Sequence, residues 1–196
     1  MNDTELMRRY AAGEEGAFQE LVNQYKDGVY RFLRRFLNRP DLVEDVFQET
    51  FLQLYVSRDK FDPSKPLRPW LFTIAANKAR DALRRRQRSD ATNLTSMFDS
   101  DECSIDDALN TLDQDEHMPY DDLIRDETAA AVKRVIAHMP ARLREILILA
   151  YFQKFPYAEI AGILGIPVGT VKSRLHTAVG RFAEDWNAAM MYEVVN

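Results

Sequence analysis

The sequence contains one cysteine, Cys103, among 196 residues. A single thiol excludes an intrachain disulfide and a thiolate zinc site. The three histidines, His117, His138 and His176, are far apart in the chain and suggest no metal cluster. Glycine is also scarce, and no glycine-rich phosphate loop or Ser/His/Asp constellation is present. We therefore expect no cofactor, no metal and no enzymatic activity.

Long apolar runs are missing as well. No stretch of eighteen or more apolar residues occurs, so we expect no insertion into a membrane. The first residues, MNDTELMRRY, lack the apolar core of a signal peptide. The sequence therefore predicts a cytoplasmic protein.

Basic residues are absent from one segment. Residues 89–123 hold eleven Asp and Glu and no Lys or Arg. Removing these charges from the net charge of −5 leaves the rest of the chain at +6. The acidic charge is thus confined to one segment with few apolar residues, which we expect to be a flexible linker.

The most informative stretch is 155–182, FPYAEIAGILGIPVGTVKSRLHTAVGRF. Two short runs with helical apolar spacing are separated by Gly165 and Pro167. Gly165 can adopt a positive φ in a sharp turn, and Pro167 suits the first position of a new helix. This pattern predicts a helix-turn-helix whose second helix enters the major groove of DNA.

The outward face of that second helix is small, polar and basic. If Val171 faces the core, Lys172, Ser173, His176 and Thr177 point away from it, with Arg174 on the flank. Such side chains suit contacts with base edges and phosphates. An ordinary helical hairpin with a solvated face is the alternative interpretation.

The first part of the chain also has helical periodicity. Residues 5–37 carry a wide apolar stripe and predict one long helix. Residues 38–41 break the pattern, and Asp41 is a plausible N-cap for a second helix from Leu42 to about Ser57. The apolar side of that second helix is made by Val43, Phe47, Thr50, Phe51 and Leu54.

The opposite face of this second helix mixes acidic and aliphatic residues. It holds Asp45, Gln48, Glu49 and Leu52, together with Gln53 and Val56. This mixture favours a protein-docking surface, although two stray exposed aliphatic residues would give the same pattern.

A third helix is predicted from Trp70 to about Arg88, after a loop at 58–69 that contains three prolines. Between Leu71 and Arg88 there are six Lys and Arg against one Asp. This bias is typical of a polyanion-binding helix, and an acidic protein or a membrane surface is the alternative partner. Its outward residues are Thr73, Asn77, Arg80 and Arg84, with Arg85, Arg86 and Arg88 at the end.

Helices are also predicted at 128–137 and 141–152, with a final helix from Arg181. The fold class is therefore all-α, with two small helical domains joined by an acidic linker. We place the domains at 1–88 and 124–196 and the linker at 89–123.

Three stretches together resemble the extracytoplasmic-function (ECF) class of bacterial sigma factors. They are VEDVFQETFLQLY, PLRPWLFTIAANKARDALRRRQR and PARLREILILAYFQKFPYAEIAGILGIPVGTVKSRLHTAVGRF. The resemblance covers roughly residues 10–88 and 124–185. It implies a subunit that binds core RNA polymerase, directs initiation at promoter DNA, and is controlled by an anti-sigma factor.

The resemblance also implies roles for individual residues. The docking helix would contact core polymerase through Asp45, Gln48, Glu49 and Leu52. The minus-ten element would be read and opened by Lys60, Phe61, Asp62, Ser64, Lys65, Arg68, Asn77, Arg80, Arg84, Arg85 and Arg88. The minus-thirty-five element would be read by Thr170, Lys172, Ser173, Arg174 and His176.

The sequence departs from the family pattern in places. Pro156 stands where a Ser or Thr cap is expected, and Pro66 and Pro69 stiffen the loop before the third helix. A stand-alone helix-turn-helix repressor is the alternative function, but no dimerisation helix is evident. A helical adaptor that binds only protein is disfavoured by the outward arginines.

Overall fold

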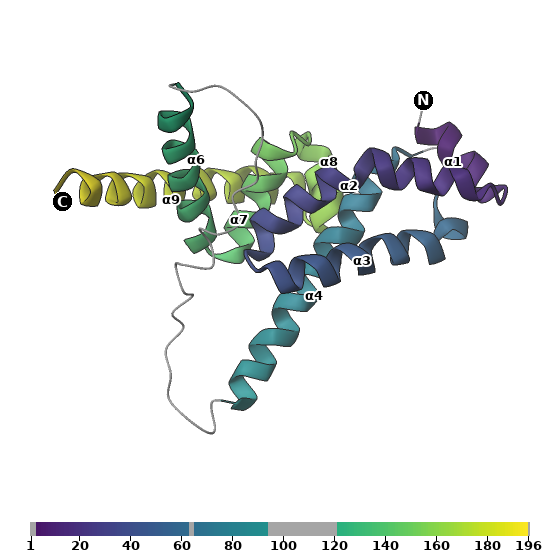
Figure 1. Cartoon of the computed structure of the whole chain (residues 1–196), viewed down its shortest axis with the longest axis horizontal. Helices are drawn as coiled ribbons and strands as arrows, with labels where there is room; N and C mark the ends of the chain where they lie inside the picture. Colours follow the sequence, from purple (N-terminus) through teal and green to yellow (C-terminus); the bar gives the residue numbers. More distant parts are fainter. Residues whose placement is uncertain (1–2, 63–64, 94–120, 196) are drawn as a thin grey trace.

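The computed structural model describes residues 3–62, 65–93 and 121–195, and every regular element in them is helical, which confirms the all-α class. The amino-terminal half contains α1 (Asp3–Ala11), α2 (Glu15–Leu37), α3 (Pro40–Val56), the short 3-10 turn η1 (Arg58–Lys60) and α4 (Leu67–Asn93). The carboxy-terminal half contains α6 (Asp121–His138), α7 (Ala141–Leu147), the π-helical turn η2 (Ile148–Phe152), α8 (Tyr157–Leu164) and α9 (Val168–Val195). Figure 1 shows these helices in order.

The predicted helix over 5–37 is two helices. The chain turns at Gly13, which has a φ of +93°. This left-handed conformation is accessible to glycine and ends α1. The turn lets α1 fold back onto α2, where Leu6, Met7 and Tyr10 are buried.

The predicted N-cap at Asp41 is wrong. Helix α3 begins at Pro40, so Arg39 occupies the cap position. Proline suits the first helical turn because its missing N–H would have no partner there. Asp41 instead accepts hydrogen bonds from the Arg39 guanidinium, at 2.8 Å to Nη2, which lowers the pKa of its carboxyl.

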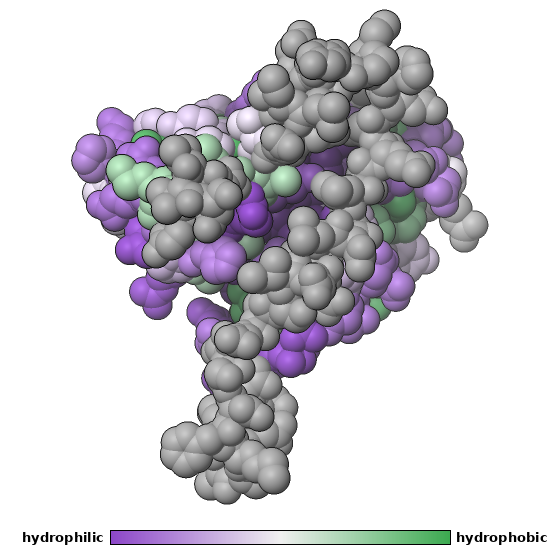
Figure 2. All heavy atoms as spheres, turned by 60° about the vertical axis from the view of Figure 1, so that its left-hand side comes forward, coloured by the Kyte–Doolittle hydropathy of each residue, from purple (hydrophilic) through white to green (hydrophobic). Residues whose placement is uncertain are grey.

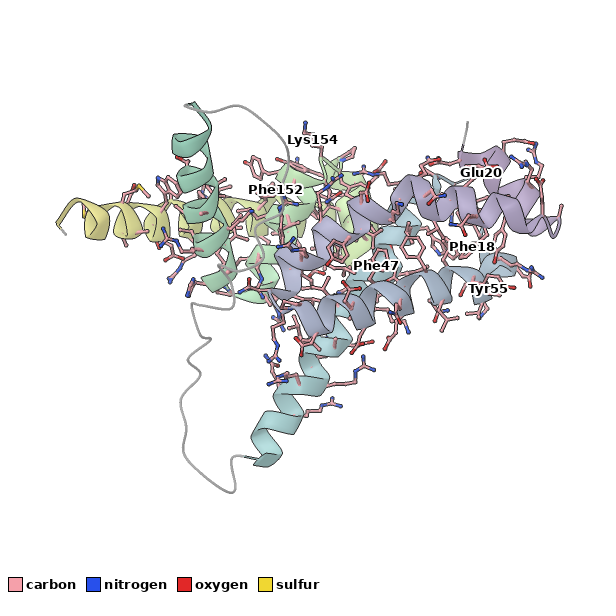
Figure 3. The ribbon with its side chains drawn as sticks, in the orientation of Figure 1. Phe18, Glu20, Phe47, Tyr55, Phe152 and Lys154 are labelled. Carbon is pink, nitrogen blue, oxygen red and sulfur yellow. The ribbon has the colours of Figure 1, made fainter. Side chains whose placement is uncertain are left out.

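The amino-terminal core is rich in aromatic rings. Phe32 stacks on Phe36 and meets the edge of Phe72 from α4, with centroids 5.8 and 5.5 Å apart. Figure 3 shows Phe47 between α2 and α3, and Phe18 beside Tyr55 at the far end of the same helix pair. These contacts explain why the apolar stripe predicted for α2 is buried.

The helix-turn-helix has the predicted construction. Gly165 ends α8 with a φ of +65°, and the Ile166 N–H donates to the Ala161 carbonyl at 3.0 Å. Helix α9 begins at Val168, so Pro167 precedes the helix by one residue and does not open it. The apolar spacing of the two runs predicts seven inner residues. Five of them are buried, namely Ile160, Leu164, Val171, Leu175 and Ala178, whereas Ala161 and Phe182 are half-buried.

Two elements of the carboxy-terminal half differ from prediction. The predicted separate helix from Arg181 is the continuation of α9, which runs unbroken for 28 residues. The helix predicted at 141–152 widens into the π-helical turn η2 after Leu147. The turn η2 ends at Phe152, and two residues later Lys154, a non-glycine residue, has a φ of +54°.

The two halves pack against each other. Helix α4 lies on α8, and α2 contacts η2 (Figure 1). Phe72 of α4 meets Phe155 at a centroid distance of 5.0 Å, and both rings are buried. Phe72 and Ala76 were not predicted to be inner residues, because α4 buries a second side against the carboxy-terminal half.

The helices on both sides extend into the segment that was predicted to be a linker. Residues 89–93 belong to α4 and residues 121–123 to α6, while the rest of that linker lies outside the described residues. No described helix is long and apolar enough to cross a bilayer. On the face in Figure 2, the coloured surface is mostly hydrophilic, with small scattered apolar areas.

Candidate nucleic-acid and protein interfaces

The start of α9 presents the polar face that the sequence predicted. Lys172, Ser173 and His176 are exposed, while Val171 and Leu175 anchor the opposite side in the core. Ser173 Oγ donates to the Thr170 carbonyl at 3.2 Å. The helix is thus held by its buried side and offers its other side to a ligand.

Arg174 occupies the flank of this surface. Its side chain is half-buried and lies close enough to Glu145 of α7 for its charge to oppose the rise that burial causes in the pKa of that carboxyl. Thr170 is also half-buried. These two residues therefore border the exposed set at Lys172, Ser173 and His176.

The basic helix α4 has a more varied environment than predicted. Asn77 is exposed, and its Oδ1 accepts a hydrogen bond from Arg80 Nη2 at 2.6 Å. Arg84 pairs with Asp81 at 3.4 Å, on the exposed surface. Arg88 is exposed near the end of the helix. These residues form a continuous polar surface.

Arg85 lies at a contact between helices. Its Nη2 is 3.5 Å from Glu49 Oε1, and Lys78 Nζ is 3.4 Å from Glu49 Oε2. Glu49 was predicted to point outward from α3, but it faces α4 and only 36% of its side chain is exposed. The α3–α4 contact therefore engages one of the four predicted docking residues.

Four more predicted DNA-contacting residues lie between α3 and α4, where Lys60 is the last residue of η1. A fifth, Ser64, lies outside the described residues. Lys60, Asp62 and Lys65 are exposed. Phe61 is half-buried and packs on Trp70, with centroids 4.9 Å apart.

Arg68 belongs to the first turn of α4, whereas the sequence placed it in the loop. Its Nη2 donates to the Gln153 carbonyl at 2.6 Å. The guanidinium carbon lies 4.0 Å from the centroid of the Phe155 ring. Arg68 is therefore engaged by the carboxy-terminal half of the chain.

The outward face of α3 carries the other docking candidates. Asp45 and Gln48 are exposed, and Leu52 is 63% exposed. Tyr55, which the sequence analysis missed, continues this face and is 46% exposed. Its position three residues after Leu52 was the signal that could have identified it.

Tyr55 also borders a hollow of about 270 Å³ that is shared with α1 and α2. Its other walls are Tyr10, Gly13, Phe18 and Arg58. The Tyr10 hydroxyl donates to the Tyr55 carbonyl at 3.1 Å, which ties α1 to the end of α3.

A buried pair of charges in α7 was also missed. Arg144 and Glu145 are buried among apolar neighbours, and Arg144 Nε and Glu145 Oε1 have no hydrogen-bond partner. Burial raises the pKa of Glu145 to about 7, and the charges of Arg80 and Arg174 oppose that shift. Burial likewise lowers the pKa of Arg144. Helical periodicity alone gave no sign that this face would be covered.

The structure thus groups the predicted residues into three surfaces. The start of α9, the α4 surface and the outer face of α3 lie on different helices. The contact between the halves engages Arg68, through the Gln153 carbonyl, and Arg80, whose Nε lies 3.5 Å from Glu145 Oε1 and whose side chain is 28% exposed. No group of three or more His, Cys, Asp or Glu side chains in the described ranges is arranged to hold a metal ion.

Two family models match the chain. Sigma-70 region 2 matches residues 21–89, which cover most of α2, all of α3 and most of α4. Sigma-70, region 4 matches residues 129–181, which include the helix-turn-helix.

Curated proteins match over nearly the full length. The ECF RNA polymerase sigma factor SigW of Bacillus subtilis is 30% identical over 87% of this chain and 89% of that protein. The RNA polymerase sigma-H factor of Pseudomonas aeruginosa is 31% identical over 90% of this chain and 89% of that protein. The ECF RNA polymerase sigma-E factor of Escherichia coli K12 is 30% identical over 91% of each.

Solved structures share the fold. CnrH, in complex with the cytosolic domain of CnrY, has a TM-score of 0.66 at 24% identity and covers 95% of this chain and 97% of its own. RpoE of Bartonella quintana, in complex with the anti-sigma factor NepR, has a TM-score of 0.67 at 24% identity, with 87% and 96% covered.

Proposed function

Because the chain belongs to the ECF RNA polymerase sigma factors and directs transcription, we propose how its surfaces divide that work. The carboxy-terminal helix-turn-helix reads the minus-thirty-five element, and the amino-terminal half docks on core polymerase and opens the minus-ten element. The chain acts in the cytoplasm, binds core RNA polymerase and promoter DNA, and catalyses no reaction itself.

The observation that carries this proposal is the recognition surface at the start of α9. Three exposed polar residues, Lys172, Ser173 and His176, stand on the first turns of α9, where the opposite side of the helix is buried. A helix that is anchored on its buried side and polar on its exposed side fits the major groove and holds its contacts in register. Thr170 and Arg174 border this set and would contact the adjacent backbone.

The amino-terminal half supplies the second DNA surface. Asn77 has amide donors and an acceptor, as recognition of an unstacked base requires, and it stands exposed on α4. Arg84 and Arg88 on the same helix would hold phosphates, contacts that position DNA without reading its sequence. Lys60 and Lys65 extend the positive charge into the preceding loop.

Docking on core polymerase is assigned to the outer face of α3. Asp45, Gln48 and Leu52 are exposed there, and Tyr55 extends the apolar part. Glu49 contributes at the margin, because its carboxylate also pairs with α4. A face that combines exposed aliphatic, aromatic and acidic groups suits a protein partner.

An anti-sigma factor is the proposed regulatory partner. The RpoE structure that shares this fold holds the anti-sigma factor NepR, and CnrH is bound to the cytosolic domain of CnrY. By analogy, this chain would be held by a protein of that kind until transcription is required.

The test is a mobility-shift and transcription assay with purified core polymerase at physiological salt. The free chain is expected to bind promoter duplex weakly, because each small basic surface depends on salt-sensitive phosphate contacts. Adding core polymerase should give specific binding, strand opening and run-off transcripts. Tight binding of a palindromic site by the free chain, without any polymerase dependence, would favour a repressor.

A further inference from the structure

Lys154 has an unusual backbone conformation just before the helix-turn-helix. Its φ is +54°, in the left-handed region. The other described non-glycine residue with a positive φ is Asn38, which caps the end of α2 at +55°. Asparagine is one of the few residues that adopt this region readily, whereas a lysine there is strained. Asn38 therefore suits its position, and Lys154 does not.

The neighbours of Lys154 impose this conformation. Gln153 and Phe155 are both buried, so the chain is fixed on either side. The Gln153 N–H donates to the Ile148 carbonyl at 3.0 Å. The Phe155 N–H donates to the Leu149 carbonyl at 3.1 Å. A glycine would satisfy the same backbone without strain, so the turn alone gives no reason for a lysine.

The positive charge of Lys154 is available to a ligand. The side chain is exposed, and Figure 3 shows it pointing outward from the turn. No carboxylate in the part of the chain that the structure describes forms an ion pair with its ammonium group. Strained residues persist where their surroundings hold them, and they gather at sites that bind a ligand. A cation kept at such a position indicates an anionic ligand.

The exposed side of α8, which follows this turn, lets another molecule approach closely. Ala158, Gly162 and Gly165 succeed one another at spacings of four and three, so they share one side of the helix, and all three are exposed. None of them has a side chain longer than a methyl group. No atom lies within 4 Å of the position that a Cβ would occupy at Gly162. The backbone of a ligand can therefore lie against α8.

The length of α8 relates Lys154 to the recognition surface. Its eight residues make a helix of roughly 12 Å, which is about the width of the major groove. In a helix-turn-helix the second helix lies in that groove while the first crosses the DNA backbone. With Lys172 and Ser173 of α9 at the base edges, the residues just before α8 lie beside a flanking phosphate. Lys154 stands three residues before Tyr157, the first residue of α8.

We propose that Lys154 binds a backbone phosphate beside the minus-thirty-five element, and that the strain at this turn is retained for that contact. The left-handed backbone directs the ammonium group outward ahead of α8. A phosphate contact carries no sequence information, but it fixes the register of the recognition helix on the duplex. This inference deepens the proposed function of the helix-turn-helix and rests on it for the promoter. The strain and the phosphate contact can also be tested on the free chain.

The first measurement separates the backbone strain from the charge by urea unfolding of the full-length chain. Lys154→Gly removes both the strain and the charge, whereas Lys154→Gln removes only the charge. The glycine variant should unfold at a higher urea concentration than the parent, and the glutamine variant should unfold with it. Asn38→Gly is the matched control, and it should raise the midpoint less because asparagine tolerates this region. A Lys154→Gly midpoint at or below that of Lys154→Gln would overturn the strain.

The second measurement is binding of the free full-length chain to a 20-base-pair duplex over a range of low salt concentrations. Lys154→Gly and Lys154→Gln should each weaken binding by about two- to fivefold and reduce the slope of log affinity against log salt by about 0.9. Lys154→Arg should bind as the parent does. Lys26→Gln, at an exposed lysine of α2, removes the same net charge and should keep the parent slope. Equal affinity and slope in Lys154→Gln and the parent would overturn the phosphate contact.

The third measurement locates the phosphate in the complex with core polymerase. Single phosphates beside the minus-thirty-five element are replaced by uncharged methylphosphonates. At one backbone position the replacement should weaken binding of the parent by about two- to fivefold and have no further effect on Lys154→Gln. If no position shows this coupling, the contact does not lie beside that element. If core polymerase forms no specific complex with the parent, the proposed function fails, and the salt slope of the free chain still decides the Lys154 contact.

Discussion

Glu145 shows how one residue's surroundings set its behaviour. Its side chain is 4% exposed, and the two cations that face it come from different helices, Arg80 of α4 and Arg174 of α9. Burial outweighs their attraction and raises the pKa of the carboxyl from an ordinary 4.5 to about 7. The ionised form is therefore less favourable in the folded chain than in the unfolded one.

This shift predicts a pH dependence of stability. In the unfolded chain Glu145 loses its proton near pH 4.5, whereas in the folded chain it does so near pH 7. The free energy of unfolding should therefore fall as pH rises through this window, by roughly 3 kcal/mol at most. Glu145→Gln should remove that part of the dependence in urea unfolding at pH 5 to 8. Glu184→Gln, at an exposed position of α9, is the control and should retain it. A parent-like slope in Glu145→Gln would contradict the assignment.

Leu52 is the residue that best tests the docking face. An Asp in its place should weaken binding to core polymerase by about 5–30-fold, because a charge replaces an apolar contact at the centre of the face. The thermal midpoint should change little, since the side chain is 63% exposed. The control is Met191→Asp, which also introduces a charge at an exposed apolar residue, here 72% exposed and on α9. It should leave the affinity for core polymerase unaltered. Equal affinity of Leu52→Asp and the parent would move the docking surface elsewhere.

At the scale of elements, the turn between α8 and α9 determines the recognition helix. Gly165 adopts a φ of +65°, a conformation that is unfavourable for residues with a side chain. No atom lies within 4 Å of the position that a Cβ would occupy there. Gly162, three residues earlier, is inside α8 with equally open surroundings and an ordinary helical backbone. The two glycines therefore differ in backbone conformation and not in space.

Alanine at these two positions should have opposite effects. Gly165→Ala should lower the free energy of unfolding by about 1 kcal/mol or more, because alanine is strained at positive φ. Gly162→Ala should raise it by about 0.5–1 kcal/mol, because alanine favours the helix interior. Denaturant midpoints measured side by side provide the comparison. The same sign for both variants would contradict this account.

Where the apolar periodicity of a helix alone decides which face is buried, that face could be predicted from the sequence. The inner and outer faces of α9 follow directly from the spacing of Val171, Leu175 and Ala178. Breaks that depend on backbone conformation were not predictable, as at Gly13, where the apolar stripe continues across the turn. Burial imposed by a distant partner was also missed, as for Phe72, whose ring is covered by Phe155. The prediction that Glu49 points outward failed for a similar reason, because two cations on α4 attract its carboxylate.

For the whole molecule, the packed halves predict cooperative unfolding. Buried side chains of both halves form one connected core that passes through the Phe72–Phe155 contact. Far-ultraviolet circular dichroism and Trp fluorescence should therefore report one coincident transition in the parent chain. Trp70 and Trp186 lie in different halves, so their fluorescence samples both. Two separated transitions in the parent would show that the halves unfold independently.

Because α9 is one unbroken helix, its far end moves together with the recognition surface on its first turns. A helix of 28 residues is roughly 42 Å long, and its first turns carry Lys172 and Ser173. If such a helix tilts by about 10° about its first turn, its far end moves by roughly 7 Å, given its length. A spectroscopic label near Met191 would therefore magnify small reorientations of the DNA-facing turns into displacements that are easy to measure.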